Sequence, residues 1–372
     1  MVRFACIAVS IGIVMLSGFV CADEVIFYVG GYTPRGDGPM KTGVSRWALD
    51  TRSGAMNEVG APAVTKNPSF LAWSQNSNRL YAVSEVGNPG GGVKAYKITA
   101  DGSLSESASI ASGGGAPCYL SLDQSGKHLL AANYGGSIAT FALDDSNDPS
   151  RVVNTIDHSG SSVNEARQKG PHPHSIVASP DNSLVFVPDL GQDKLVAYAF
   201  DSDSGKLTPE PAKDVATPPG AGPRHLIFHP TLPYAYASFE LSNEIGSYRY
   251  ADGTLRSIGV QSTLPDGFTE SNTTAEVRIH PNGKFVYISN RGHDSIAAFR
   301  INPSDGTLTH ISTTSVQGKT PRNFNIDHSG RIMVVANQQS NSLVSFYIDP
   351  ESGVLAPTGK SAQVPAPTYV LF

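Results

Sequence analysis

Hydrophobic and polar positions along the chain repeat in a unit of about fifty residues. Each unit opens near a proline with an apolar segment, passes through a turn rich in Asn, Ser, Asp and Gly, and continues with a second apolar segment that ends in polar residues. A third segment of alternating character, such as 137–141 or 295–299, and a fourth, more polar segment complete the unit. Short alternating segments between turn residues predict strands, and no stretch supports a helix of more than a turn or two.

Four short strands in each repeat of this length are typical of propeller blades. Seven unit starts align along the chain, so the predicted fold class is all-β: a seven-bladed β-propeller with four-stranded blades. The seven starts are Pro68, Pro117, Pro173, Pro223, Thr274, Pro321 and Pro367.

The two ends of the chain predict how the ring closes. Residues 25–29 match the second strand of a unit, whereas residues 368–372 match a first strand. Pairing these N- and C-terminal strands would complete the seventh blade and remove the open sheet edges that promote aggregation. We therefore expect one closed domain over residues 23–372, although a chain of 372 residues suggests two or three domains by length alone.

Residues 1–22 are predicted to be a signal peptide, because a positive residue is followed by a short apolar stretch and small residues. We expect cleavage and export to the periplasm or the exterior, without stable membrane insertion; a retained anchor is the alternative. Cys6 and Cys21 lie in this segment, so the mature chain has a single cysteine and no internal disulfide bond. That cysteine, Cys118, is expected to be a small buried residue.

Composition excludes some partners before any site is considered. The formal net charge is −5 and charged residues make up 16% of the chain, so it lacks the basic surface that nucleic acid or an anionic membrane requires. Local arginines would have to hold any anionic ligand. A propeller that closes on itself needs no partner subunit, and we expect a monomer.

The repeat also predicts which side chains meet. The hairpin turn lies nine residues after each unit start, so the first and seventeenth positions after the start lie at the same face of the ring. Because the first strand lines the central channel, these positions form the rim of one channel mouth. They hold Ser69, Cys118, His174, Arg224, Ala275, Arg322 and Thr368 on the first strand, and Glu85, Tyr134, Leu190, Glu240, Arg291 and Gln338 on the second.

Three arginines, two glutamates and a histidine thus converge on one rim, although charged residues are scarce in this chain. A concave site with several guanidinium groups and isolated carboxylates suits an anionic substrate. His174 is the candidate for an acid, a base or an oxyanion-stabilising group. Solvated loop charges, or structural pairs between blades, remain the alternative reading. Candidates for substrate binding around this rim are Arg322, His225, Glu85, His172 and Asn290.

Neither a metal nor a cofactor is expected. His172 and His174 form a His-x-His pair, but no third ligand follows at a recognisable spacing. The glycine runs 90–92 and 113–115 do not follow a strand and open a helix, as phosphate-binding loops do.

Five segments carry a resemblance to a known family: GPHPHS at 170–175, GPRHLIFHP at 222–230, FEL at 239–241, HPNGKFVYISNR at 280–291 and TPRNFNIDHSG at 320–330. Here the sequence resembles the lactonase family of seven-bladed propellers, which includes propeller-type 6-phosphogluconolactonases and is related to carboxymuconate lactonizing enzyme. The resemblance implies hydrolysis of a sugar lactone, 6-phosphogluconolactone or a related aldonolactone, with a small anionic substrate and no cofactor. It implies that the catalytic residues are His174, Arg224, Glu240 and Arg291, with Arg322 beside them.

A mechanism follows in which the arginines hold the anionic group and the developing oxyanion, while a base removes a proton from water. Glu240 and His174 are both candidates for the base, and the sequence does not choose between them. Two other functions stay open: a muconate-type lactonizing cycloisomerase, and a propeller that binds a ligand without chemistry. Export would also separate the protein from cytosolic sugar phosphates, so its lactone could differ.

Overall fold

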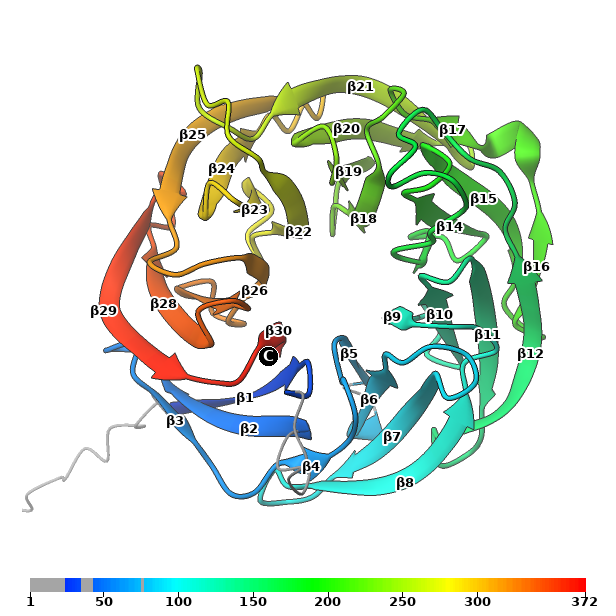
Figure 1. Cartoon of the computed structure of the whole chain (residues 1–372), viewed down its shortest axis with the longest axis horizontal. Coiled ribbons are helices and arrows are strands. Elements are labelled where there is room, and N and C mark those ends of the chain that lie inside the picture. The colour runs from blue at the N-terminus through cyan, green and yellow to red at the C-terminus, as the bar shows by residue number, and fades with distance from the viewer. Residues whose placement is uncertain (1–23, 35–42, 75–76) are drawn as a thin grey trace, which may run out of the picture.

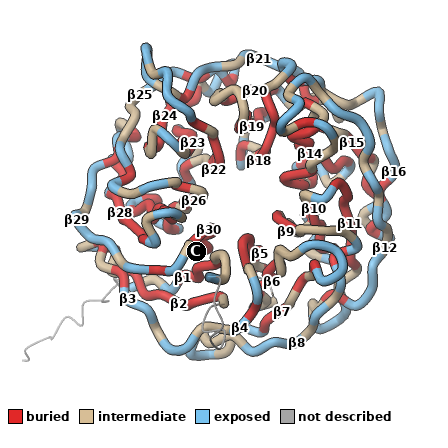
Figure 2. Tube along the Cα trace, in the orientation of Figure 1, coloured by how far each residue is buried: buried red, intermediate tan, exposed pale blue. Residues whose placement is uncertain are grey.

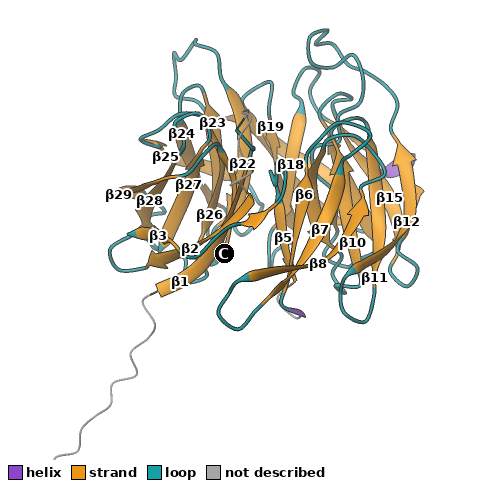
Figure 3. Cartoon of the chain, turned by 60° about the horizontal axis from the view of Figure 1, so that its bottom comes forward, coloured by secondary structure: helices purple, strands orange, loops and turns teal. Residues whose placement is uncertain are grey.

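The computed structural model describes residues 24–34, 43–74 and 77–372. The predicted signal peptide, residues 1–22, lies outside the described residues. The predicted fold class is confirmed, because seven antiparallel sheets stand in a ring around a central axis (Figure 1). Strands make up most of the ring, and loops lie at its two ends (Figure 3). Within the described residues, no helix is long and apolar enough to cross a membrane.

In each blade the strands follow one another from the axis to the rim. Blade one contains β5 (Leu71–Ser74), β6 (Arg79–Ser84), β7 (Gly92–Ile98) and β8 (Leu104–Ala111). Blade two contains β9 (Pro117–Leu122), β10 (His128–Asn133), β11 (Ser137–Leu143) and β12 (Pro149–Asp157). Blade three contains β13 (Val177–Ala178), β14 (Leu184–Asp189) and β15 (Lys194–Asp201), with β16 (Lys206–Pro209) and β17 (Val215–Ala216) both paired to β15 and the short helix η2 (Pro211–Lys213) between them.

The next three blades are regular. Blade four contains β18 (Pro223–Phe228), β19 (Tyr234–Phe239), β20 (Glu244–Ala251) and β21 (Thr254–Ser262). Blade five contains β22 (Thr273–Ile279), β23 (Phe285–Arg291), β24 (Ser295–Ile301) and β25 (Leu308–Ser315). Blade six contains β26 (Pro321–Ile326), β27 (Ile332–Asn337), β28 (Ser342–Ile348) and β29 (Leu355–Gln363).

Blade seven is built from both ends of the chain, as the sequence predicts. The C-terminal strand β30 (Pro367–Leu371) lies innermost and pairs with β1 (Glu24–Gly31), with Val29 opposite Val370. The blade continues with β2 (Gly43–Asp50), to which β3 (Met56–Glu58) and β4 (Ala63–Val64) both pair. Phe27 packs against Phe372 at a ring separation of 5.2 Å. Apolar contacts therefore stabilise the closure of the ring together with the backbone hydrogen bonds between β1 and β30.

The core lies between the blades rather than in one central mass. Six clusters of buried apolar side chains together span all seven contacts between neighbouring blades. Figure 2 shows the consequence, with buried segments inside and exposed outer strands such as β12 and β29 at the rim. A tyrosine on a second strand also donates a hydrogen bond to a turn carbonyl of the next blade at four contacts. These pairs are Tyr28 with Gly102 (2.8 Å), Tyr81 with Asn147 (2.7 Å), Tyr236 with Gly306 (3.1 Å) and Tyr287 with Gly353 (3.0 Å).

One feature of the inner strands refines the predicted rim. In blade two Pro117 pairs with Asn133 and Tyr119 with Ala132, so Cys118 is an extra residue in a β-bulge. The same register shift occurs at the start of β18, β26 and β30. A bulge re-aims the side chain of its extra residue, and here it does so at the predicted rim positions. The residues re-aimed in this way include Cys118, Arg224, Arg322 and Thr368, which all line the narrow part of the channel.

The closure yields a stability prediction. Phe27 is fully buried against Phe372 and Trp47, so Phe27→Ala should lower the free energy of unfolding by about 3–5 kcal/mol. Its neighbour Ile26 is 37% exposed, and Ile26→Ala is the matched control, with an expected change below about 1 kcal/mol. Urea unfolding of both variants measures the difference. Equal losses would contradict the assigned role of Phe27.

Candidate active site at the channel mouth

The rim side chains surround a cavity of about 280 Å³ at one end of the channel. We call it the mouth cavity. Six of the seven blades, or the loops that join them, contribute to its wall, so the predicted convergence of distant residues is present. The wall is made of Glu85, Cys118, Tyr134, Arg167, His174, Glu240, Thr273, Arg291 and Arg322.

Glu240 lies at the centre of a cluster of guanidinium groups. Its Oε1 is 2.7 Å from Arg167 Nη2, and its Oε2 is 3.0 Å from both Arg224 Nε and Arg291 Nη2. Burial alone would raise the pKa of this carboxyl group, but the charges of Arg291 and Arg224 hold its pKa well below the ordinary value. Glu240 therefore stays ionised and fixes the three cations in place.

The arginines differ in their freedom to bind a ligand. Burial, together with the neighbouring Arg291 and Arg322, lowers the pKa of Arg224 to about 10, which still leaves it charged at neutral pH. Arg291 also donates to the carbonyl oxygen of Thr274 at 2.8 Å. Arg322 lies over the ring of Tyr32 at 5.3 Å and has no carboxylate or hydrogen-bond partner among the described residues. Its guanidinium N–H groups are therefore available to an anion in the cavity.

His174 forms part of the wall beside Cys118, with Nδ1 3.9 Å from Sγ. Its ring meets the rings of Tyr134 and His225 edge to face. Burial and the charge of Arg224 lower the pKa of His174 well below 6.5, so the imidazole is neutral at pH 7. A neutral imidazole can donate one hydrogen bond and accept another, which suits the hydroxyl groups of a sugar.

His225 does not line the mouth cavity but lies beneath it. Its Nε2 is 3.2 Å from Arg224 Nη1, and its Nδ1 is 3.3 Å from a carboxylate oxygen of Glu276. Glu276 is held in turn by Arg278, at 3.2 Å. His225 and Glu276 thus support Arg224 from inside the channel, whereas the sequence proposed His225 as a substrate-binding residue.

Arg224, predicted to be catalytic, lies in the narrow part of the channel rather than in the wall of the mouth cavity, and His172 and Asn290 also lie outside that wall. The His172 ring stacks on Tyr134 at 4.3 Å, and its Nδ1 is 2.8 Å from the Tyr134 carbonyl oxygen. Asn290 is buried and bonded to Thr263 through both ends of its amide group. Substrate contact by His172 and Asn290 stays a prediction, and their geometry supports a structural role. Glu85, by contrast, lines the cavity as expected.

Arg167 is a site residue that sequence reasoning missed. It lies on the loop 158–172, which the repeat pattern does not cover, and the only trace of this loop in the sequence is the long interval between Pro117 and Pro173. Asp189 holds both ends of the loop, by accepting hydrogen bonds from the backbone of His172 and from the ring of His158.

Tyr32 was also missed, although a signal for it existed. It follows β1 directly, so it occupies in blade seven the position that Glu85 occupies in blade one. Its hydroxyl donates to both carboxylate oxygens of Glu85, at 2.9 and 3.0 Å. The predicted pairing of the chain ends would have located it.

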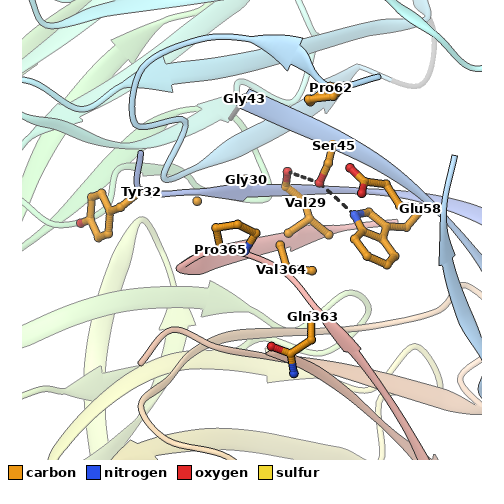
Figure 4. A pocket seen from close by; sticks show the side chains of 12 residues that line it. Val29, Gly30, Tyr32, Gly43, Ser45, Glu58, Pro62, Gln363, Val364 and Pro365 are labelled. Atoms are coloured by element: carbon orange, nitrogen blue, oxygen red, sulfur yellow. Dashed lines mark hydrogen bonds between the residues drawn. The ribbon is translucent and has the colours of Figure 1, made fainter. Parts of the chain in front are cut away.

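Two other features of the described chain are less suited to this role. Among the described residues no group of three or more His, Cys, Asp or Glu side chains could hold a metal ion. A pocket of about 180 Å³ in blade seven, shown in Figure 4, has Glu58 as its one charged wall residue. There Ser45 accepts a hydrogen bond from Trp47 at 2.8 Å and packs beside Val29, so this wall is mainly structural.

Comparison with known proteins identifies the family that the chain matches. The sequence matches the family described as "Lactonase, 7-bladed beta-propeller" over residues 26–372. It is 36% identical to a 6-phosphogluconolactonase of Bacillus subtilis over 82% of this chain and 85% of that protein. It is 34% identical to a 6-phosphogluconolactonase of Formosa agariphila over 81% and 86% of the two chains. The solved structure of PpgL, the periplasmic gluconolactonase of Pseudomonas aeruginosa, is similar with a TM-score of 0.86 at 31% identity, over 93% of this chain and 98% of that chain.

The buried His225 predicts how stability depends on pH. Burial and the charge of Arg224 lower the pKa of His225 from 6.5 to about 4. Between pH 6.5 and pH 4 this imidazole is therefore protonated in the unfolded chain and neutral in the folded protein. The contribution of neutral His225 to the free energy of unfolding is complete above pH 6.5 and is lost as the pH falls toward 4. Its size is about 3 kcal/mol.

Urea unfolding at pH 7, 5.5 and 4 measures this dependence. The decline of the unfolding free energy should be smaller in His225→Gln than in the unsubstituted protein by about that amount. His310 is exposed on β25, and His310→Gln should keep the full decline. A full decline in His225→Gln as well would show that another group causes it.

Proposed function

Because the chain belongs to the lactonase family of seven-bladed propellers, we propose that it hydrolyses a sugar lactone in the mouth cavity. The observation that carries the proposal is the Arg322 guanidinium, which lines the cavity without an ion-pair or hydrogen-bond partner among the described residues. Attack on a lactone carbonyl turns its oxygen into an anion, and a cation held in place for that oxygen lowers the barrier.

The charges around the cavity favour an anionic substrate. Three arginines of the wall, Arg167, Arg291 and Arg322, stand against two glutamates, while His174 is neutral, so one positive charge is in excess. Arg167 is the most exposed of the three cations around Glu240, with 38% of its side chain accessible. Its position at the outer edge suits an anionic group remote from the reacting carbonyl.

The reaction forms one carbon–oxygen bond, breaks another and involves three proton transfers. Water adds to the carbonyl carbon while a base accepts one of its protons, and the oxyanion forms beside Arg322. The tetrahedral intermediate then expels the ring oxygen, which takes up that proton and becomes a hydroxyl group. The remaining carboxylic acid ionises at neutral pH and releases one proton to solvent.

The geometry supports other roles for both candidates for the base that the sequence left open. Glu240 is bound by three guanidinium groups, and a carboxylate held ionised so firmly is a weak proton acceptor. We assign it the role of fixing Arg224 and Arg291 for the substrate. His174 is assigned a hydrogen bond to a substrate oxygen, since its neutral imidazole lies in the wall.

For the substrate we propose 6-phosphogluconolactone or a related aldonolactone. The names of the two relatives and the positive excess of the cavity support the phosphorylated lactone. The predicted signal peptide and the name of the periplasmic relative support an exported enzyme and an unphosphorylated lactone. Both lactones therefore belong in the assay.

A pH-stat measurement of acid release tests the activity directly. The protein without residues 1–22 should accelerate hydrolysis of 6-phosphogluconolactone, gluconolactone or both above the spontaneous rate. Arg322→Gln should lower kcat by about 100-fold to 1,000-fold, the usual effect of removing an oxyanion donor. Carboxymuconolactone serves as a third substrate, because turnover of that compound alone would favour the muconate-type alternative. No acceleration on any lactone would reject the proposal.

Arg167→Gln separates the two substrates. If Arg167 binds the phosphate group, KM for 6-phosphogluconolactone should rise at least about 10-fold more than KM for gluconolactone, as expected for loss of a charged hydrogen bond. Steady-state kinetics on both lactones give the ratio. An equal change in both KM values would mean that Arg167 acts only through Glu240.

A further inference from the structure

The mouth cavity contains a second carboxylate, Glu85, whose surroundings differ from those of Glu240. Its hydrogen-bond donors are neutral hydroxyl groups: Tyr32 at 2.9 and 3.0 Å, and Ser69, which donates to Oε2. No Arg, Lys or His side chain in the described part of the chain lies within ion-pair distance of Glu85. Its negative charge is therefore not held by a guanidinium contact.

The carboxylate also has room for a water molecule. Two carboxylate oxygens accept about four hydrogen bonds, and Tyr32 and Ser69 leave part of the capacity of Oε1 unused. Glu85 is half-buried at the end of β6 and lines the mouth cavity. Water bound there would lie inside the cavity that the substrate enters.

Glu85 lies next to the proposed oxyanion site. The Tyr32 phenol contacts the Glu85 carboxylate through its hydroxyl group and the Arg322 guanidinium through its ring face, at 5.3 Å from the centroid. Burial, together with the charge of Glu85, raises the pKa of Tyr32, although Arg322 opposes the shift, so the phenol stays a neutral donor. The Tyr32 side chain thus contacts both the Glu85 carboxylate and the Arg322 guanidinium, which places the two groups near each other on one side of the cavity.

We propose that Glu85 is the general base of the reaction, a catalytic residue, and that Tyr32 and Ser69 are its positioning residues. The inference rests on the proposed lactone hydrolysis.

In this step Glu85 accepts a proton from water as the new carbon–oxygen bond forms, and the carbonyl electron pair moves to the oxygen beside Arg322. When the ring carbon–oxygen bond breaks, the protonated Glu85 returns the proton to the departing ring oxygen. No oxidant, reductant or further reactant is needed. Glu240 keeps its ion pairs throughout, which explains why one mouth holds two carboxylates with such different neighbours.

The experiment compares three glutamate variants in the pH-stat assay. Glu85→Gln should lower kcat by at least about 100-fold, with KM unchanged or lower, as expected for loss of a base rather than of a binding group. Glu85→Asp, which keeps the charge and shortens the reach, should give an intermediate kcat and guards against misfolding of the first variant. Glu58→Gln, in the blade-seven pocket, is the matched control and should keep the kcat of the unsubstituted protein.

Chemical rescue gives a second readout that a structural role would not produce. Added formate should raise kcat of Glu85→Ala in proportion to its concentration and should not raise kcat of Glu240→Ala. If the unsubstituted protein hydrolyses a lactone while Glu85→Gln keeps more than about a third of kcat, the assignment of Glu85 is overturned and the lactonase proposal stands. If formate rescues Glu240→Ala instead, Glu240 is the base. If the unsubstituted protein hydrolyses no lactone, both proposals are overturned.

Discussion

The backbone pairing of β30 with β1 is the interaction on which the rest of the molecule depends. Each blade buries its faces only against its two neighbours, so the apolar clusters between blades are complete only when the ring is closed. Closure also sets the radius at which the seven inner strands stand. A common radius brings the first residues of those strands to one opening, which no local interaction within a single blade could do.

Closure also allows the protein to bury charge. Arg224, Glu240 and Glu276 are each less than 5% exposed, and removing such groups from water is unfavourable unless each has a partner. Glu240 directly follows β19 of blade four, and it pairs with Arg224 of the same blade and with Arg291 of blade five. The pair between Arg291 and Glu240 therefore crosses a blade boundary at the place where binding is proposed. Arg322 lacks such a carboxylate partner among the described residues, and this imbalance makes the cavity electropositive.

The repeat in the sequence predicted most of the fold and several residues of the site. Strand positions, blade number and closure follow from local patterns that each unit repeats, and Arg224, Glu240, Arg291 and Arg322 follow from their equal distances to the unit starts. The bulges at Cys118 and Arg322 do not follow, because a register shift depends on sheet twist and on contact with neighbouring strands. The pairing of Glu240 with Arg167 and Arg291 depends on contacts between side chains from different parts of the ring. Arg167 could not be predicted from the sequence, because its loop lies outside the repeat.

That loop has a consequence for how such an enzyme can change. Residues 158–172 are fastened at both ends to Asp189, and Asp193 adds bonds to Ser162 and Gln168 within them. These anchors belong to blade three and are independent of what the loop presents to the opening. A different side chain at Arg167 would therefore alter what the opening accepts while leaving the seven-fold scaffold intact. Selectivity could diverge among descendants of this chain through one short insertion, with the hydrolytic apparatus inherited unchanged.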